Sequence, residues 1–159
     1  MIWSLGKLTV AAAAGLLLAA GASAQPAPPM PAATIQRTIT SWGLLGTWTV
    51  DCARPVGEQW ARLRYAVTPQ GGVVQERDFG DPKRNDRLDV TSATLAKGGA
   101  IELALYNNNS GQTRLVTMTK QPDKRIRAMA NRVRDGEVVI ANGRFVATGN
   151  ETPALQKCD

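Results

Sequence analysis

Acidic residues crowd the segment between positions 76 and 89, and their types and spacing suit acid–base catalysis or metal binding. Glu76 and Asp78 fall on one face of a strand, where paired carboxylates can exchange protons with a substrate or bind calcium. Basic residues are interleaved with these acids, which favours the alternative of a solvated, ion-paired hairpin. The acids are Glu76, Asp78, Asp81, Asp86 and Asp89, and the bases are Arg77, Lys83, Arg84 and Arg87.

The chain contains no histidine. It therefore lacks the side chain that most often serves as a general base near neutral pH and as a metal ligand. Ser-His-Asp and Cys-His arrangements are excluded, so catalysis would depend on other paired groups, most simply carboxylates. We therefore expect a protein that is not an enzyme and that uses no cofactor and no metal ion.

The N-terminus has the three parts of a secretory signal peptide. Lys7 supplies a positive charge, residues 8–20 form an apolar run, and Ala22-Ser23-Ala24 precedes Gln25 as a cleavage site. The run is shorter than the roughly 20 apolar residues that a membrane span needs, although an uncleaved anchor is the alternative. We predict a signal peptide over residues 1–24, a periplasmic location and no membrane span in the mature form.

The chain contains two cysteines, Cys52 and Cys158. In an exported domain without a Cys-x-x-Cys motif, two cysteines most simply form one structural disulfide. The bridge would close a loop of about 105 residues and contribute roughly 4.7 kcal/mol in the chain-entropy model. A redox-active pair is the alternative.

The elements that position these residues begin after a proline-rich segment. We expect residues 25–45 to be a tether and lead-in, with a short helical turn between Thr34 and Leu45, and residues 46–159 to form one domain. The net charge of +6 keeps such a protein soluble or attracts an anionic partner. Nucleic acid is not an expected partner, because the basic residues are scattered and the chain is exported.

Short apolar segments separated by Gly, Asn or Pro follow one another throughout the domain, and they are typical of sequential β-hairpins. They span residues 46–52, 62–67, 73–79, 88–95, 101–106, 115–119, 126–133 and 138–140, with Asn142-Gly143 as a turn or a kink before residues 144–146. About eight such strands avoid exposed edges by closing on themselves. The sequence therefore predicts an all-β fold, a small closed up-and-down antiparallel barrel whose first strand neighbours the C-terminal tail.

Gly46-Thr47-Trp48 resembles the Gly-x-Trp signature of the lipocalin and avidin-like (calycin) barrels. The resemblance implies a lipocalin-like barrel in which Trp48 closes one end and Arg144, near the last strand, packs on it. It further implies a carrier of small hydrophobic molecules or, as in some bacterial relatives of the architecture, a protease inhibitor.

A basic set and several aromatic residues are the candidate ligand contacts. The basic set consists of Lys124, Arg125, Arg127, Arg132 and Arg134. Ile126, Ala128 and Ala130 alternate onto the opposite face from Arg125 and Arg127, and their small side chains leave room inside a barrel. Arg132 continues that alternation, so we expect it at the barrel mouth, where it would receive an anionic head group; the alternative is a solvated Arg132 beyond the strand end.

Tyr65 and Tyr106 alternate with aliphatic residues and are expected to line the interior. Trp60 is expected at the rim of a pocket, with ordinary packing as the alternative. The predicted core residues are Leu63, Val67, Ile101, Leu103, Leu105, Ile126 and Val138.

Two function classes fit these patterns better than an enzyme. The first is an exported periplasmic binding module that holds a small apolar or amphipathic ligand in the barrel. The second is a cell-envelope protein-interaction or inhibitor module that acts through its outer surface. The volume of the barrel interior and the polarity of its lining distinguish them.

Overall fold

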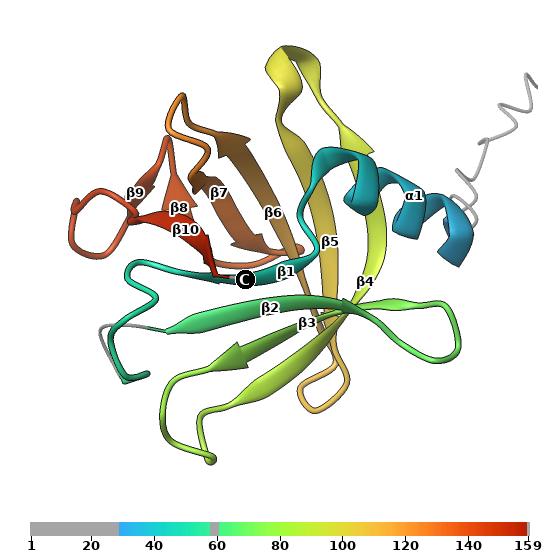
Figure 1. Cartoon of the computed structure of the whole chain (residues 1–159), viewed down its shortest axis with the longest axis horizontal. Coiled ribbons are helices and arrows are strands. Elements are labelled where there is room, and N and C mark those ends of the chain that lie inside the picture. The colour runs from blue at the N-terminus through green and yellow to red at the C-terminus, as the bar shows by residue number, and fades with distance from the viewer. Residues whose placement is uncertain (1–28, 58–60, 159) are drawn as a thin grey trace, which may run out of the picture.

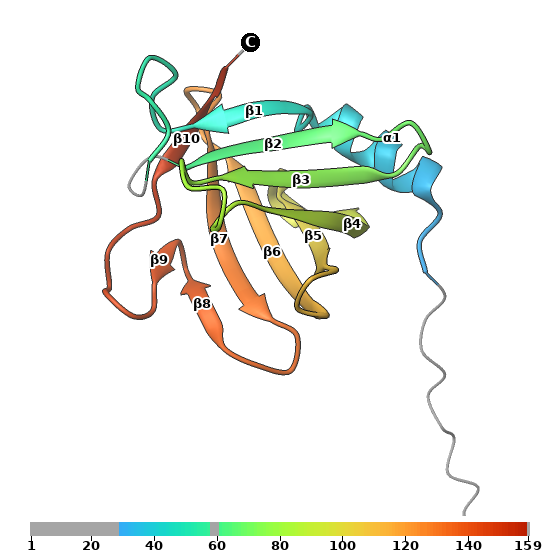
Figure 2. The same cartoon turned by 90° about the horizontal axis from the view of Figure 1, so that it is seen from below.

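The computed structural model describes residues 29–57 and 61–158 (Figures 1 and 2). The expected signal peptide and the start of the tether lie outside these residues. The elements are α1 (Ala32–Trp42), β1 (Gly46–Thr49), β2 (Arg62–Val67), β3 (Val73–Asp78), β4 (Asp86–Leu95), β5 (Ile101–Asn107), β6 (Gln112–Lys120), β7 (Ile126–Val133), β8 (Val138–Ala141), β9 (Arg144–Phe145) and β10 (Ala154–Cys158).

The strands close into an antiparallel barrel, as the sequence predicts. The sheet order is β10-β1-β2-β3-β4-β5-β6-β7-β8-β9, and β10 also pairs with β7, so that β1–β7 and β10 form a ring of eight strands. β10 was not predicted as a strand. It lies between β1, where Trp48 is opposite Lys157, and β7, where Ile126 is opposite Leu155. β8 and β9 form a hairpin on the other half of β7.

A β-bulge in β7 changes which side chains point inward. Thr117 and Met118 are consecutive on β6, but they pair with Ala130 and Ala128, so Met129 is an extra residue on β7. Such an insertion reverses the alternation beyond it. Ala128 therefore faces the interior, whereas Ala130 faces outward.

Helix α1 covers one end of the barrel, beside β3 and β4 (Figure 2). Ile35, Ile39 and Trp42 recur at helical spacing and are buried, so this face of the helix joins the barrel core. The helix ends at Gly43, whose φ of 80° is readily adopted only by glycine. The sequence predicts only a helical turn here, whereas the structure contains eleven helical residues.

Trp48 lies in the core at the same end of the barrel. Its Nε1 donates a hydrogen bond to the carbonyl oxygen of Leu44 at 2.7 Å. Gly46 has a φ of 121°, which side-chain-bearing residues rarely adopt, so the backbone conformation favours glycine at this position. The Nζ of Lys157 lies 5.8 Å from the centroid of a Trp48 ring.

The predicted core is largely confirmed. Ile101, Leu103, Leu105 and Ile126 are buried and Leu63 is partly buried against them. The prediction was wrong for Val67 and Val138, whose side chains are 38% and 45% exposed.

The disulfide is also confirmed. Cys52 and Cys158 are bonded, with their Cα atoms 5.7 Å apart, so the bridge joins the segment after β1 to the end of β10. Disulfides persist in oxidising compartments. No helix in the described residues is long and apolar enough to span a membrane.

Candidate functional site

A cavity of about 320 Å³ lies inside the barrel, on the side away from α1. Eight strands, six from the ring and the two of the β8–β9 hairpin, contribute side chains to it, and most of the wall is apolar. Leu63, Leu105, Val116, Met118, Ile126 and Leu155 supply much of this apolar surface. The wall also contains four polar or charged side chains from β3, β6 and β7, namely Gln75, Arg77, Arg114 and Asn131.

Gln75 is held by Tyr65, which lies opposite it on β2. The Nε2 of Gln75 donates a hydrogen bond to the hydroxyl oxygen of Tyr65. The tyrosine is 1% exposed, and burial raises the pKa of its hydroxyl well above the ordinary value, because the interior solvates a phenolate poorly. Tyr65 thus lies inside the barrel in its neutral form.

Arg77 is paired within the barrel. Its Nε donates a hydrogen bond to Oδ1 of Asp86 at 2.6 Å, and Nη2 donates to the second carboxylate oxygen. The guanidinium carbon also lies 5.8 Å from the ring centroid of Phe79. A bidentate pair of this kind fixes both side chains and balances the charge of Arg77.

Arg114 and Asn131 lie close together on the wall formed by β6 and β7. Arg114 is two residues before Val116, and Val116 is opposite Asn131. Both residues line the cavity, and both are half-buried. The Oδ1 atom of Asn131 is buried and has no hydrogen-bond partner.

Neither Arg114 nor Asn131 was predicted from the sequence to contact a ligand. Arg114 preceded the predicted strand, although its alternation with Val116 and Met118 could have extended that strand to include it. Asn131 was missed because strict alternation from Ala128 places it outside. The bulge at Met129 instead turns Asn131 inward.

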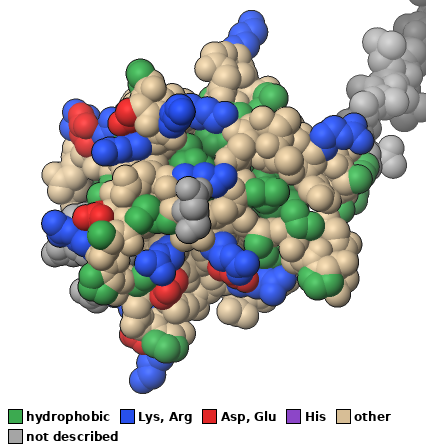
Figure 3. Space-filling model, in the orientation of Figure 1, with side chains coloured by type: hydrophobic (Ala, Val, Ile, Leu, Met, Phe, Trp, Pro, Cys, Tyr) green, Lys and Arg blue, Asp and Glu red, His purple; other side chains and the backbone are tan. Residues whose placement is uncertain are grey.

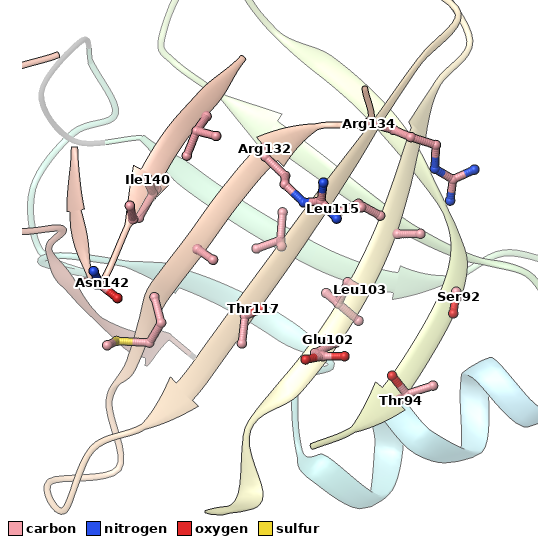
Figure 4. A pocket seen from close by; sticks show the side chains of 16 residues that line it. Ser92, Thr94, Glu102, Leu103, Leu115, Thr117, Arg132, Arg134, Ile140 and Asn142 are labelled. Atoms are coloured by element: carbon pink, nitrogen blue, oxygen red, sulfur yellow. The ribbon is translucent and has the colours of Figure 1, made fainter. Parts of the chain in front are cut away.

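The same bulge corrects the prediction for Arg132. This residue does not lie at the barrel mouth; it lines a groove of about 630 Å³ on the outer face of β4–β8. In Figure 4, Arg132 and Arg134 lie toward one end of the groove, and Glu102 and Thr94 lie toward the other. Arg132 is exposed, as the alternative interpretation expected, but it lies within β7 and not beyond the strand end.

The remaining candidate residues lie apart from the cavity. Tyr106 is opposite Asp89 and Thr113, on the side of β5 away from buried Leu105, so it faces outward. Trp60 lies outside the described residues.

Arg144 does not pack on Trp48. Its Nη2 donates to Oε1 of Glu151 at 2.9 Å and its Nη1 donates to the carbonyl oxygen of Gly149 at 3.0 Å. The cation that lies near the Trp48 ring is Lys157, where the resemblance implied Arg144.

The acidic candidates are engaged in local contacts. Glu76 accepts a hydrogen bond from Arg64 at 3.0 Å, across β2 and β3. Asp78 accepts hydrogen bonds from the backbone N–H of Gly80 and from Nδ2 of Asn85. The pairs Arg64–Glu76 and Arg77–Asp86 match the ion-paired interpretation of this segment. Figure 3 shows acidic side chains among basic ones on one face of the molecule.

The closed antiparallel barrel is compatible with a calycin-like fold. No family model, curated protein or solved structure matches the chain.

Proposed function

We propose that this protein is an exported, non-enzymatic binding module that holds a small amphipathic ligand inside its barrel. The observation that carries the proposal is the interior cavity of about 320 Å³. Ligand pockets typically measure roughly 300 to 1,000 Å³ and combine an apolar wall with a few convergent polar groups. The cavity has this composition, because aliphatic side chains surround most of it and Gln75, Arg77, Arg114 and Asn131 supply the polar groups.

Export to the periplasm is supported by two independent features. The first 24 residues have the charge, apolar run and small residues of a signal peptide. The disulfide between Cys52 and Cys158 is typical of an oxidising compartment. Export, a closed barrel and an apolar interior cavity together fit a lipocalin-like carrier best.

A pair of alanine substitutions tests the proposal. Ala128 lines the cavity, and Ala130, two residues further along β7, lines the outer groove. We expect native mass spectrometry of protein purified from its own host to show a bound small molecule. Ala128→Leu should remove that molecule by filling the cavity, and Ala130→Leu should retain it.

Circular dichroism and thermal unfolding establish that both variants are folded. The proposal is overturned if the wild type carries no ligand and gains no thermal stability from any aliphatic carboxylate or alcohol. It is equally overturned if folded Ala128→Leu binds as tightly as the wild type.

A second candidate is an envelope protein-interaction module that uses the outer groove. The groove favours it because it is larger than the cavity and carries Arg132 and Arg134. Immobilised protein should then capture one envelope partner that survives moderate salt. Ala130→Leu should abolish capture and Ala128→Leu should not, which is the opposite pattern to ligand binding.

A further inference from the structure

The charge lining the interior cavity is unbalanced. The charged side chains in its described wall are Arg77 and Arg114, both cations. Asp86 neutralises Arg77 through the bidentate pair. Within residues 29–57 and 61–158, no carboxylate forms an ion pair with Arg114. A half-buried guanidinium without a counter-ion favours an anionic ligand.

Asn131 supplies a second and independent requirement. Its Oδ1 atom is buried without a hydrogen-bond donor. Leaving a buried acceptor unpaired is unfavourable. Asn131 lines the cavity, so a turn of its side-chain amide toward the cavity would let Oδ1 accept a hydrogen bond from a bound molecule. Val116 connects the two residues, because it lies two positions after Arg114 on β6 and opposite Asn131 on β7. One small head group can therefore reach both side chains.

We propose, on the basis of the proposed function, that the ligand is a small aliphatic carboxylate with a hydroxyl close to the carboxylate. The guanidinium of Arg114 donates hydrogen bonds to the carboxylate oxygens. The hydroxyl donates to Oδ1 of Asn131. The aliphatic body lies against the apolar wall that includes Leu105 and Met118.

Four probes with the same chain length separate the contributions to binding. They are β-hydroxyoctanoate, octanoate, octanol and octylamine, and calorimetric titration measures the affinity of the full-length mature protein for each. We expect β-hydroxyoctanoate to bind most tightly, octanoate next and octanol more weakly, and we expect no binding of octylamine. A charge-assisted hydrogen-bond pair corresponds to a difference of about tenfold to a hundredfold between octanoate and octanol.

Matched variants assign the head-group contacts. Arg114→Gln should lower octanoate affinity by at least about tenfold while leaving octanol affinity unchanged, and Arg114→Lys should retain part of the octanoate affinity. Arg132→Gln removes a cation from the outer groove of the same barrel and should change neither affinity. Asn131→Leu should equalise the affinities for β-hydroxyoctanoate and octanoate.

The outcomes separate this inference from the proposed function. If no probe binds, octanol included, then the cavity is not a ligand site for such molecules and both proposals fail. If octanol binds as tightly as octanoate, or if folded Arg114→Gln binds octanoate like the wild type, the cavity binds ligands but the anionic class is wrong. If the hydroxyl adds no affinity in the wild type, the role of Asn131 is wrong.

Discussion

Tyr65 and Gln75 are directly opposed on β2 and β3, and the Gln75 amide donates a hydrogen bond to the Tyr65 hydroxyl inside the barrel. The hydroxyl lies 3.9 Å from Sδ of Met118, to which it donates in turn. The three side chains thus connect the polar part of the cavity wall to its apolar part. Because Tyr65 is almost fully buried, the barrel accommodates it only as the neutral phenol.

Alkaline pH should destabilise the protein through Tyr65. Its pKa is raised in the folded state, so the unfolded chain loses the tyrosine proton first, above its ordinary pKa of 10.0. The stabilisation is fully present below that pH and is lost as the pH rises toward the folded pKa. Urea unfolding between pH 8 and about 11 should show a decline that is weaker in Tyr65→Phe. Parallel declines in the two proteins would contradict this assignment.

Breaking the disulfide should lower the free energy of unfolding by about 2 to 5 kcal/mol, because the bridge closes a loop with a sequence separation of 106. The double variant Cys52→Ser/Cys158→Ser and the reduced wild type should unfold at the same lower urea concentration. Both should keep the β circular dichroism signal at low urea. Equal midpoints for the oxidised and reduced protein would contradict the prediction.

Helix α1 should contribute to barrel stability rather than act as a linker. Ile39 is fully buried in the core, so Ile39→Ala should cost about 2 to 5 kcal/mol by thermal or urea unfolding. Thr40→Ala is the control, because Thr40 is exposed on the same helix and its loss should cost less than about 0.5 kcal/mol. Similar effects of the two substitutions would mean that the helix does not pack as described.

The bulge in β7 predicts opposite accessibilities for two consecutive residues. The new cysteine of the Arg132→Cys variant should react rapidly with a thiol reagent. The new cysteine of a separate Asn131→Cys variant should react slowly. The reason is that Asn131 faces the cavity while Arg132 faces the outer groove. Without the bulge the order would be reversed, so faster labelling at position 131 would contradict the register. Denatured samples, in which both sites are open, provide the control.

Acid should weaken the contacts that hold the loop before β10. Arg127 donates a hydrogen bond to Glu151 at 2.6 Å and Arg144 donates another at 2.9 Å. These contacts, led by the Arg127 hydrogen bond, hold the pKa of Glu151 below its ordinary value. The stabilisation is therefore present above the unfolded pKa and is lost as pH falls through the lower folded pKa.

Substitution of Glu151 tests this acid dependence. Glu151→Gln should be less stable than the wild type near neutral pH, and the difference should shrink at acid pH. Glu137→Gln, an exposed glutamate before β8, is the control. A difference that stays constant with pH would show that the charge of Glu151 contributes nothing.

Most strands could be predicted because their evidence is local. Alternation and turn residues identify strands such as 101–106 and 126–133 within about two residues of the observed bounds. The disulfide could be predicted equally well, because two cysteines in an oxidising compartment allow only one intramolecular pairing. The absence of histidine likewise narrows the possible catalytic chemistry from the sequence alone.

The composition of the candidate site depended on contacts between distant segments. β10 is a strand because β1 and β7 provide hydrogen-bond partners on both sides, and its five residues carry no strong pattern of their own. The bulge at Met129 is visible only in the pairing of β7 with β6, yet it decides that Asn131, not Arg132, faces the cavity. The sequence by itself determined most of the strands, the lack of histidine and the pairing of Cys52 with Cys158. Only the tertiary structure decided which side chains meet inside the barrel, because a single inserted residue reverses every later side chain on a strand.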